Sequence, residues 1–130
     1  MGSLTPEQRQ VFLDKNFGVV ATIRRDGSPQ LTAVWIDADG DDVLFNITET
    51  RKKLANLERD PRATVFVQAG DDAYRWVSVS GRVELEREGA TEHIHKLSRK
   101  YRGREYDLPE GQQRLLVRVK PQRVTAYGLD

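Results

Sequence analysis

The chain contains no cysteine among its 130 residues, and this absence removes several functions at once. Without thiols the protein can have no disulfide framework, no thiolate metal site and no cysteine nucleophile. Histidine is nearly as scarce, because His93 and His95 are the only two. They lie two residues apart, which on a helix places them on nearly opposite faces. We therefore expect no metal site at these histidines.

Long apolar runs and a strong net charge are also missing. No apolar stretch approaches the roughly 20 residues of a membrane-spanning helix, and the start of the chain lacks a signal-peptide pattern. The formal net charge is +1, so no overall field attracts nucleic acid or a membrane surface. We expect a cytoplasmic protein with one domain over residues 1–130 and neither a membrane nor a nucleic-acid partner. Any anion site must be local.

Strand patterns dominate the chain and are separated by three helical segments. Thr5, Pro6 and Gln8 have the spacing of a capping box, and Asp26-Gly27 is a hairpin turn signal. The expected elements are a helix at 6–15, a three-strand meander over 17–48, a helix at 50–59, strands at 63–69 and 73–86, a helix at 88–103, and a strand at 113–128 bent at Pro121. Hairpin-joined strands with few helices predict a mainly β (α+β) fold, a six-stranded antiparallel barrel flanked by short helices.

Two further patterns bear on function. The acidic loop of Asp37, Asp39, Asp41 and Asp42 resembles a calcium loop, but its glycine and its twelfth residue do not fit, so a polar turn is favoured. In the strand at 73–86, the face that carries Tyr74, Trp76, Ser78 and Ser80 suits a partner or ligand surface, with ordinary surface aromatics as the alternative.

The chain offers no self-sufficient catalytic constellation. Serine hydrolysis needs a nucleophile, a base and an orienting group, and none of the serines lies in a nucleophile-elbow pattern. Most carboxylates fall in turns, where solvation explains them. If the protein is an enzyme, a bound cofactor is expected to carry the chemistry.

Three consecutive cations begin the helix at 50–59, where the helix dipole favours acidic residues. On a helical wheel Lys53 and Arg51 flank the apolar seam, and Lys52 points into solvent. Two cations beside free helix N–H groups suit a phosphate or a carboxylate. The alternative is a solvated surface helix in which Glu49 pairs with Lys53.

Four segments resemble the pyridoxamine 5′-phosphate oxidase-like split β-barrel family: "GVVATIRRDGSPQLTAVWI", "TETRKKLANLERDPRATVFVQ", "WVSVSGRVEL" and "LLVRVKPQRV". They are most similar to its small members that use coenzyme F420, a deazaflavin hydride carrier. The resemblance covers residues 7 to 128 and implies a homodimer, with cofactor sites at the subunit interface of an FMN-binding type of split barrel.

The resemblance also implies a set of cofactor-binding residues. Arg51 and Lys53 would bind the cofactor phosphate, with Asn56 nearby, while Gln68 and Trp76 would approach from the dimer partner. The segment Pro29 to Val34, with Ile47 and Thr48, would line the ring. Within this segment the resemblance implies contacts from Pro29, Gln30, Thr32, Ala33 and Val34.

The implied activity is an F420H2-dependent reductase that passes a hydride to a small organic acceptor, without an obligatory side-chain acid or base. The alternatives are an FMN-dependent enzyme of the oxidase type and a non-catalytic protein that carries F420 or a flavin. The short chain and the Arg-x-Lys pattern favour F420 over FMN.

Overall fold

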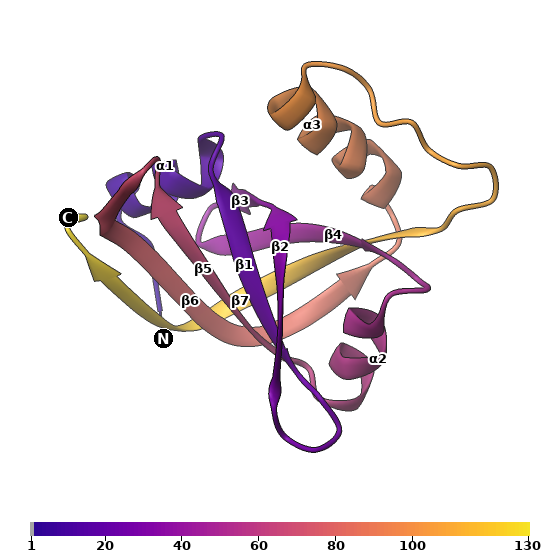
Figure 1. The fold of residues 1–130 in the computed structure, drawn as a ribbon, viewed down its shortest axis with the longest axis horizontal. Coiled ribbons are helices and arrows are strands. Elements are labelled where there is room, and N and C mark those ends of the chain that lie inside the picture. The colour runs from indigo at the N-terminus through magenta and orange to yellow at the C-terminus, as the bar shows by residue number, and fades with distance from the viewer. Residues whose placement is uncertain (1) are drawn as a thin grey trace.

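The computed structural model describes residues 2–130 as one curled antiparallel sheet with three helices around it (Figure 1). The strands are β1 (Phe17–Ile23), β2 (Pro29–Trp35), β3 (Asp37–Asp39), β4 (Asp42–Thr48), β5 (Arg62–Ala69), β6 (Asp72–Glu86) and β7 (Arg114–Tyr127). The helices are α1 (Pro6–Leu13), α2 (Lys52–Arg59) and α3 (Ala90–Arg102). The protein is thus mainly β, as the strand patterns predicted.

The order of the strands corrects two expectations. The sheet has seven strands rather than six, in the order β2-β1-β5-β6-β7-β4-β3. The extra strand β3 comes from the acidic loop, which pairs with β4 as a short hairpin. The three-strand meander over 17–48 is wrong, because β2 pairs only with β1 among the described strands, whereas β4 pairs with β7. The chain passes from one edge of the sheet, β2, to the other, β3, through the single residue Ile36, which is fully buried.

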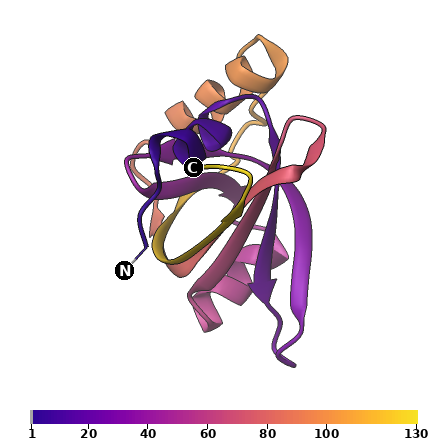
Figure 2. The same cartoon turned by 90° about the vertical axis from the view of Figure 1, so that its left-hand side faces the viewer.

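The curl of the sheet encloses an apolar core (Figure 2). Its centre consists of fully buried valines on β5, β6 and β7, which alternate with outward-facing residues as the period of a strand requires. These are Val65, Val67, Val77, Val79, Val117 and Val119. Because the strands curl, β2 and β4 approach each other without pairing. The barrel is therefore split between these two strands.

The helices close the ends of the curled sheet. The predicted capping box is present in α1, since Gln8 N–H donates to Thr5 Oγ1 at 3.2 Å and Thr5 N–H donates to Gln8 Oε1 at 3.0 Å. This helix ends at Leu13, two residues earlier than predicted, and buries Val11 and Phe12. In Figure 1, α2 and α3 lie on either side of β4, next to the split.

The predicted bend of the last strand is a register shift. Gly81 of β6 lies opposite Pro121 of β7, and the ladder shifts between Ser80 and Gly81. A Cβ at Gly81 would stand 1.8 Å from the carbonyl oxygen of Lys120, so a side chain does not fit there. Close approach of the two backbones requires glycine at this position.

Within residues 2–130, no helix has the length and apolarity to cross a membrane.

Candidate functional site

A cleft of about 810 Å³ lies at the split between β2 and β4, and the N-terminus of α2 and the side of α3 add to its walls. The strands contribute Phe17, Gln30, Thr32, Ala33, Val34, Trp35, Asn46, Ile47, Thr48 and Arg114, and the helices and loops contribute Thr50, Arg51, Lys52, Lys53, Ile94, Leu97, Arg102 and Tyr106. Because β2 is an edge strand, one side of its backbone is free to bond a ligand.

The walls of the cleft carry positive charge without acidic residues. Five lining residues are cations, and no aspartate or glutamate lines the cleft. Among the described residues, no carboxylate lies within ion-pair distance of Arg51, Lys53 or Arg114. Such a cluster repels itself unless an anion enters. The alternative reading, in which Glu49 pairs with Lys53, is not met, because Glu49 pairs with Arg87.

Burial and the neighbouring cations both lower the pKa of Lys53. This pKa falls from 10.5 to about 8, through burial first and then through the charges of Arg51 and Arg114. Burial also lowers the pKa of Arg114, and the charge of Arg51 adds to this effect. A bound phosphate or carboxylate would reverse both effects, because an anion nearby favours the charged form of a cation.

The start of α2 differs from the helical wheel in one respect. The helix begins at Lys52, and Arg51 is its N-cap residue, with an extended backbone (φ −79°, ψ 146°) and no side-chain cap. Arg51 therefore lies outside the helix, and the wheel does not describe it. Lys52 is exposed, as expected, yet it also lines the cleft, because it stands in the first turn. The first N–H groups of α2 are available to an anion.

Asn56 supports the cleft from behind and does not line it. Its side chain is buried, and its Nδ2 donates to Thr22 Oγ1 at 3.0 Å and to Gln30 Oε1 at 2.8 Å. Its Oδ1 accepts from Arg59 at 3.1 Å. Asn56 thus ties α2 to β1 and β2 and orients Gln30, which does line the cleft.

Thr32 lies near the middle of the β2 wall. Its hydroxyl oxygen is buried and has no hydrogen-bond partner among the described residues. An unpaired buried hydroxyl costs free energy, which a ligand at this wall could recover.

Eight of the twelve predicted residues line the cleft: Gln30, Thr32, Ala33, Val34, Ile47, Thr48, Arg51 and Lys53. Pro29 lies in a separate hollow of about 300 Å³. Gln68 and Trp76 pair across β5 and β6, and the ring of Trp76 lies 5.5 Å from that of Phe66. These two residues lie outside the cleft of their own chain.

Sequence reasoning missed Arg114 and the aromatic wall beside α3. Arg114 lies opposite Thr48 in the β4–β7 ladder, and it is 9% exposed. Trp35 stacks on Tyr101 at 5.5 Å and meets Tyr106 edge-on at 6.4 Å. Strand pairing over a long sequence separation brings Arg114 to the cleft, and the packing of α3 and of the loop that follows it places the aromatic residues. No local pattern could have found either.

The sequence profile of the pyridoxamine 5′-phosphate oxidase family matches residues 4–128, so the chain belongs to this family. The fold is similar to that of a protein described as an F420 reductase, with a TM-score of 0.82 and 26% identity over 94% of this chain and 98% of the other. A conserved hypothetical protein of Mycobacterium tuberculosis gives a TM-score of 0.72 at 25% identity, over 96% and 86% of the chains.

General stress protein 26 of Bacillus anthracis shares the fold with a TM-score of 0.76 at 16% identity, over 95% of this chain and 93% of the other. The family match thus assigns the chain to the pyridoxamine 5′-phosphate oxidase family, and the structural neighbours share its split-barrel fold.

Proposed function

We propose that the protein is an F420H2-dependent reductase, whose cleft binds coenzyme F420 and a small organic hydride acceptor. The observation that carries this proposal is the cluster of five cations around a cleft without acidic residues. F420 carries a phosphate and further carboxylates on its tail, whereas FMN carries a single phosphate. Lys53, Arg51 and Arg114 would bind the phosphate, and the exposed Lys52 and Arg102 suit the tail.

The residues of the cleft also fit a planar ring. The β2 wall offers small and apolar residues, Ala33 and Val34, beside the unpaired Thr32 hydroxyl. Ile47 lies on the opposite wall, on β4. When bound, F420 supplies two-electron hydride chemistry. The protein would contribute the position of the ring and the exclusion of water.

We assign no side chain to proton donation. The cleft is lined by neither a carboxylate nor an imidazole within the described part of the chain. In this proposal the acceptor takes its proton from water.

The proposal includes a homodimer of chains that each act as one domain over residues 1–130. An apolar face on the outside of β2, β1 and β5 supports it: Leu31 is 62% exposed, Phe17 60% and Phe66 39%. Val19 lies opposite Phe66, so these side chains form a continuous surface. Such a surface on a small chain is typical of a protein interface. Gln68 and Trp76 at its border would reach the partner's cleft.

The second candidate is an FMN-dependent enzyme, which the description of the matched family favours. Separate titrations of the purified protein with F420 and FMN distinguish the two. The proposal expects F420 to bind at micromolar concentration or better, and tight FMN binding without F420 binding would refute it.

A carrier without activity is the third reading. Turnover of reduced F420 with quinones, tetrapyrroles or unsaturated lactones would separate a reductase from a carrier. Binding without turnover of any acceptor would favour the carrier.

A further inference from the structure

Arg114 is held in the cleft by neutral partners. Its Nε donates to Asn46 Oδ1 at 2.8 Å, and a terminal nitrogen donates to Gln112 Oε1 at 3.1 Å. The guanidinium lies 5.1 Å above the ring of Tyr106. These contacts fix the position of the guanidinium. Because no carboxylate among the described residues pairs with Arg114, its charge stays available to a ligand.

The side chain of Asn46 can take only one orientation here. Its Nδ2 donates to the carbonyl oxygen of Ala90 at 2.9 Å and lies 3.2 Å from His93 Nδ1. Both amide hydrogens are thus directed toward α3, and the oxygen faces Arg114. A flipped amide would oppose oxygen to oxygen at Ala90 and N–H to N–H at Arg114.

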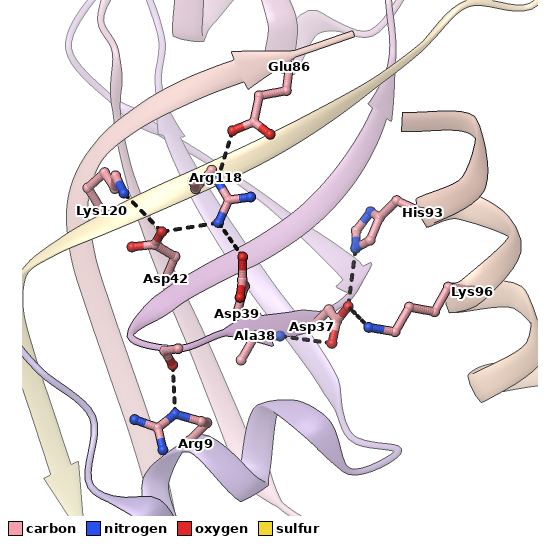
Figure 3. A network of polar contacts seen from close by, with 11 residues as sticks. Arg9, Asp37, Ala38, Asp39, Asp42, Glu86, His93, Lys96, Arg118 and Lys120 are labelled. Atoms are coloured by element: carbon pink, nitrogen blue, oxygen red, sulfur yellow. Dashed lines mark hydrogen bonds and ion pairs between the residues drawn. The ribbon is translucent and has the colours of Figure 1, made fainter. Parts of the chain in front are cut away.

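His93 supports that orientation from within α3. Its side chain is 6% exposed, and Nε2 lies 3.4 Å from Asp37 Oδ2 (Figure 3). Because Nδ1 accepts from Asn46, the proton of the neutral ring is on Nε2 and faces the Asp37 carboxylate. The imidazole therefore presents an acceptor to Asn46 and turns its N–H toward the Asp37 carboxylate, at ion-pair distance.

Asp37 supplies a permanent negative charge for this ring. Burial by itself would raise the pKa of Asp37, but hydrogen bonds from His93, Lys96 and the N–H of Ala38 outweigh it and lower the pKa to about 2. Lys96 Nζ donates to Asp37 Oδ2 at 2.9 Å. The carboxylate is ionised at any ordinary pH, and it fixes the tautomer of His93.

We propose that Asp37, His93 and Asn46 are positioning residues, which hold the Arg114 guanidinium in the anion site of the cleft. The role of these three residues in ligand binding rests on the function proposed above. Asp37 and His93 do not line the cleft, so they would act on a ligand only through Asn46 and Arg114, which do.

The first test needs no ligand. The Nε–H signal of Arg114 in a ¹⁵N spectrum should exchange slowly with solvent in the wild-type protein. His93→Leu and Asn46→Ala should speed this exchange about tenfold or more, because each removes a hydrogen bond that orders the chain. His93→Gln, whose amide oxygen can replace Nδ1 as the acceptor, should restore slow exchange. Glu92→Gln, on an exposed position of α3, is the matched control.

The second test is a double-mutant cycle on the dissociation constant of F420, or of FMN if that is the ligand. His93→Leu should weaken binding about tenfold in the wild-type background and hardly at all in an Arg114→Met background. The melting temperature of each variant shows whether it is folded. Equal weakening in both backgrounds would mean that His93 acts through the packing of α3, and would overturn the proposal.

The two tests separate this inference from the proposed function. An Arg114 signal that does not respond to His93→Leu overturns the positioning role, whichever cofactor binds. If the signal responds but the wild-type protein binds neither F420, FMN nor inorganic phosphate, the proposed function fails, and the role of this network in ligand binding fails with it.

Discussion

At the scale of single residues, Lys53 shows how the site is prepared for an anion. Its pKa is lowered to about 8 by burial and by the charges of Arg51 and Arg114. Between pH 8 and 10.5 the unfolded chain therefore binds more protons at Lys53 than the folded chain does. Stability of the ligand-free protein must rise with pH across this window, as far as Lys53 is concerned. Lys100, whose pKa burial lowers to about 8, adds to the same trend.

Lys53→Met should thus stabilise the ligand-free protein at pH 7 while it weakens cofactor binding. The gain in free energy of unfolding should be about 1–2 kcal/mol, because a shift of one pKa unit corresponds to about 1.4 kcal/mol and partial exposure of Lys53 reduces the effect. Urea unfolding of both proteins at pH 7 and pH 10 measures it. Both proteins contain Lys100, so its contribution cancels in the difference between their free energies of unfolding. That difference should shrink at pH 10. A destabilised variant would contradict the account of Lys53.

The three cations at the start of α2, Arg51, Lys52 and Lys53, should contribute unequally to binding. Lys53→Ala and Arg51→Ala should each weaken cofactor binding by about 1–3 kcal/mol, as for the loss of a charged hydrogen bond. Lys52→Ala should cost less, because this side chain is exposed and solvent screens its charge. Fluorescence titration gives the three affinities. Equal losses would show that the cations act only as a diffuse field.

Single residues also show how far a sequence can specify a site. Lys53 was predicted at the cleft, because the helix fixes its position relative to Leu57 within about one turn. Arg51 also lines the cleft, but it does so as the N-cap residue, outside the helix that the prediction assumed. Arg114 was missed, because its place depends on the register between β4 and β7. That register joins residues separated by more than sixty positions, and no local pattern encodes it.

At the scale of elements, the buried polar side chain of Asn56 ties α2 to the sheet beside the apolar contact of Leu57. Asn56→Ala removes the hydrogen bonds to Thr22 and Gln30, which leaves the buried Thr22 hydroxyl without this partner. We expect a loss of about 1–3 kcal/mol in the free energy of unfolding and weaker cofactor binding through Gln30. Thermal unfolding and titration measure the two effects. Glu58→Gln, exposed on the same helix, is the control and should change neither.

The elements that sequence reasoning placed well are those with strong local signals. The capping box of α1 and the alternation of β6 around Val77 and Val79 are present in the structure. The strand β3 was missed because its residues, Asp37 to Asp39, have low strand propensity. Asp37 lies there because Lys96 and His93 offset its burial, and these are tertiary contacts.

At the scale of the whole molecule, the split of the barrel and the apolar outer face share one strand, β2. The sheet does not close between β2 and β4, and this opening forms the cleft. The strand β2 also carries Leu31 on the exposed apolar face. A second copy on that face would bring its own residues to the border of the cleft.

Phe66→Glu should therefore convert the proposed dimer into a monomer, because the dimer would bury a charge beside Val19. Light scattering should give a mass near twice 14.9 kDa for the wild-type protein and near 14.9 kDa for the variant. Leu85→Glu is the control and should remain dimeric, because Leu85 is exposed near the end of β6, seven residues beyond Ser78, which pairs with Phe66. A monomeric wild-type protein would contradict the proposed homodimer.

The family was predicted from the resemblance of four segments, and the family profile over residues 4–128 confirms it. The strand order could not be read from patterns alone. The hairpin signals indicated which strands follow each other, but not that β2 would be an edge and β4 would pair with β7.

The central claim is that the cationic cleft is the F420 site, and one measurement tests it most directly. Titration of the wild-type protein and of Lys53→Met with F420, followed by the fluorescence of the cofactor, should give a dissociation constant in the micromolar range or below for the wild type. Binding by the variant should be about tenfold weaker or more, as expected for the loss of a charged contact. Failure of the wild-type protein to bind F420, or equal affinity of the two proteins, would contradict the account.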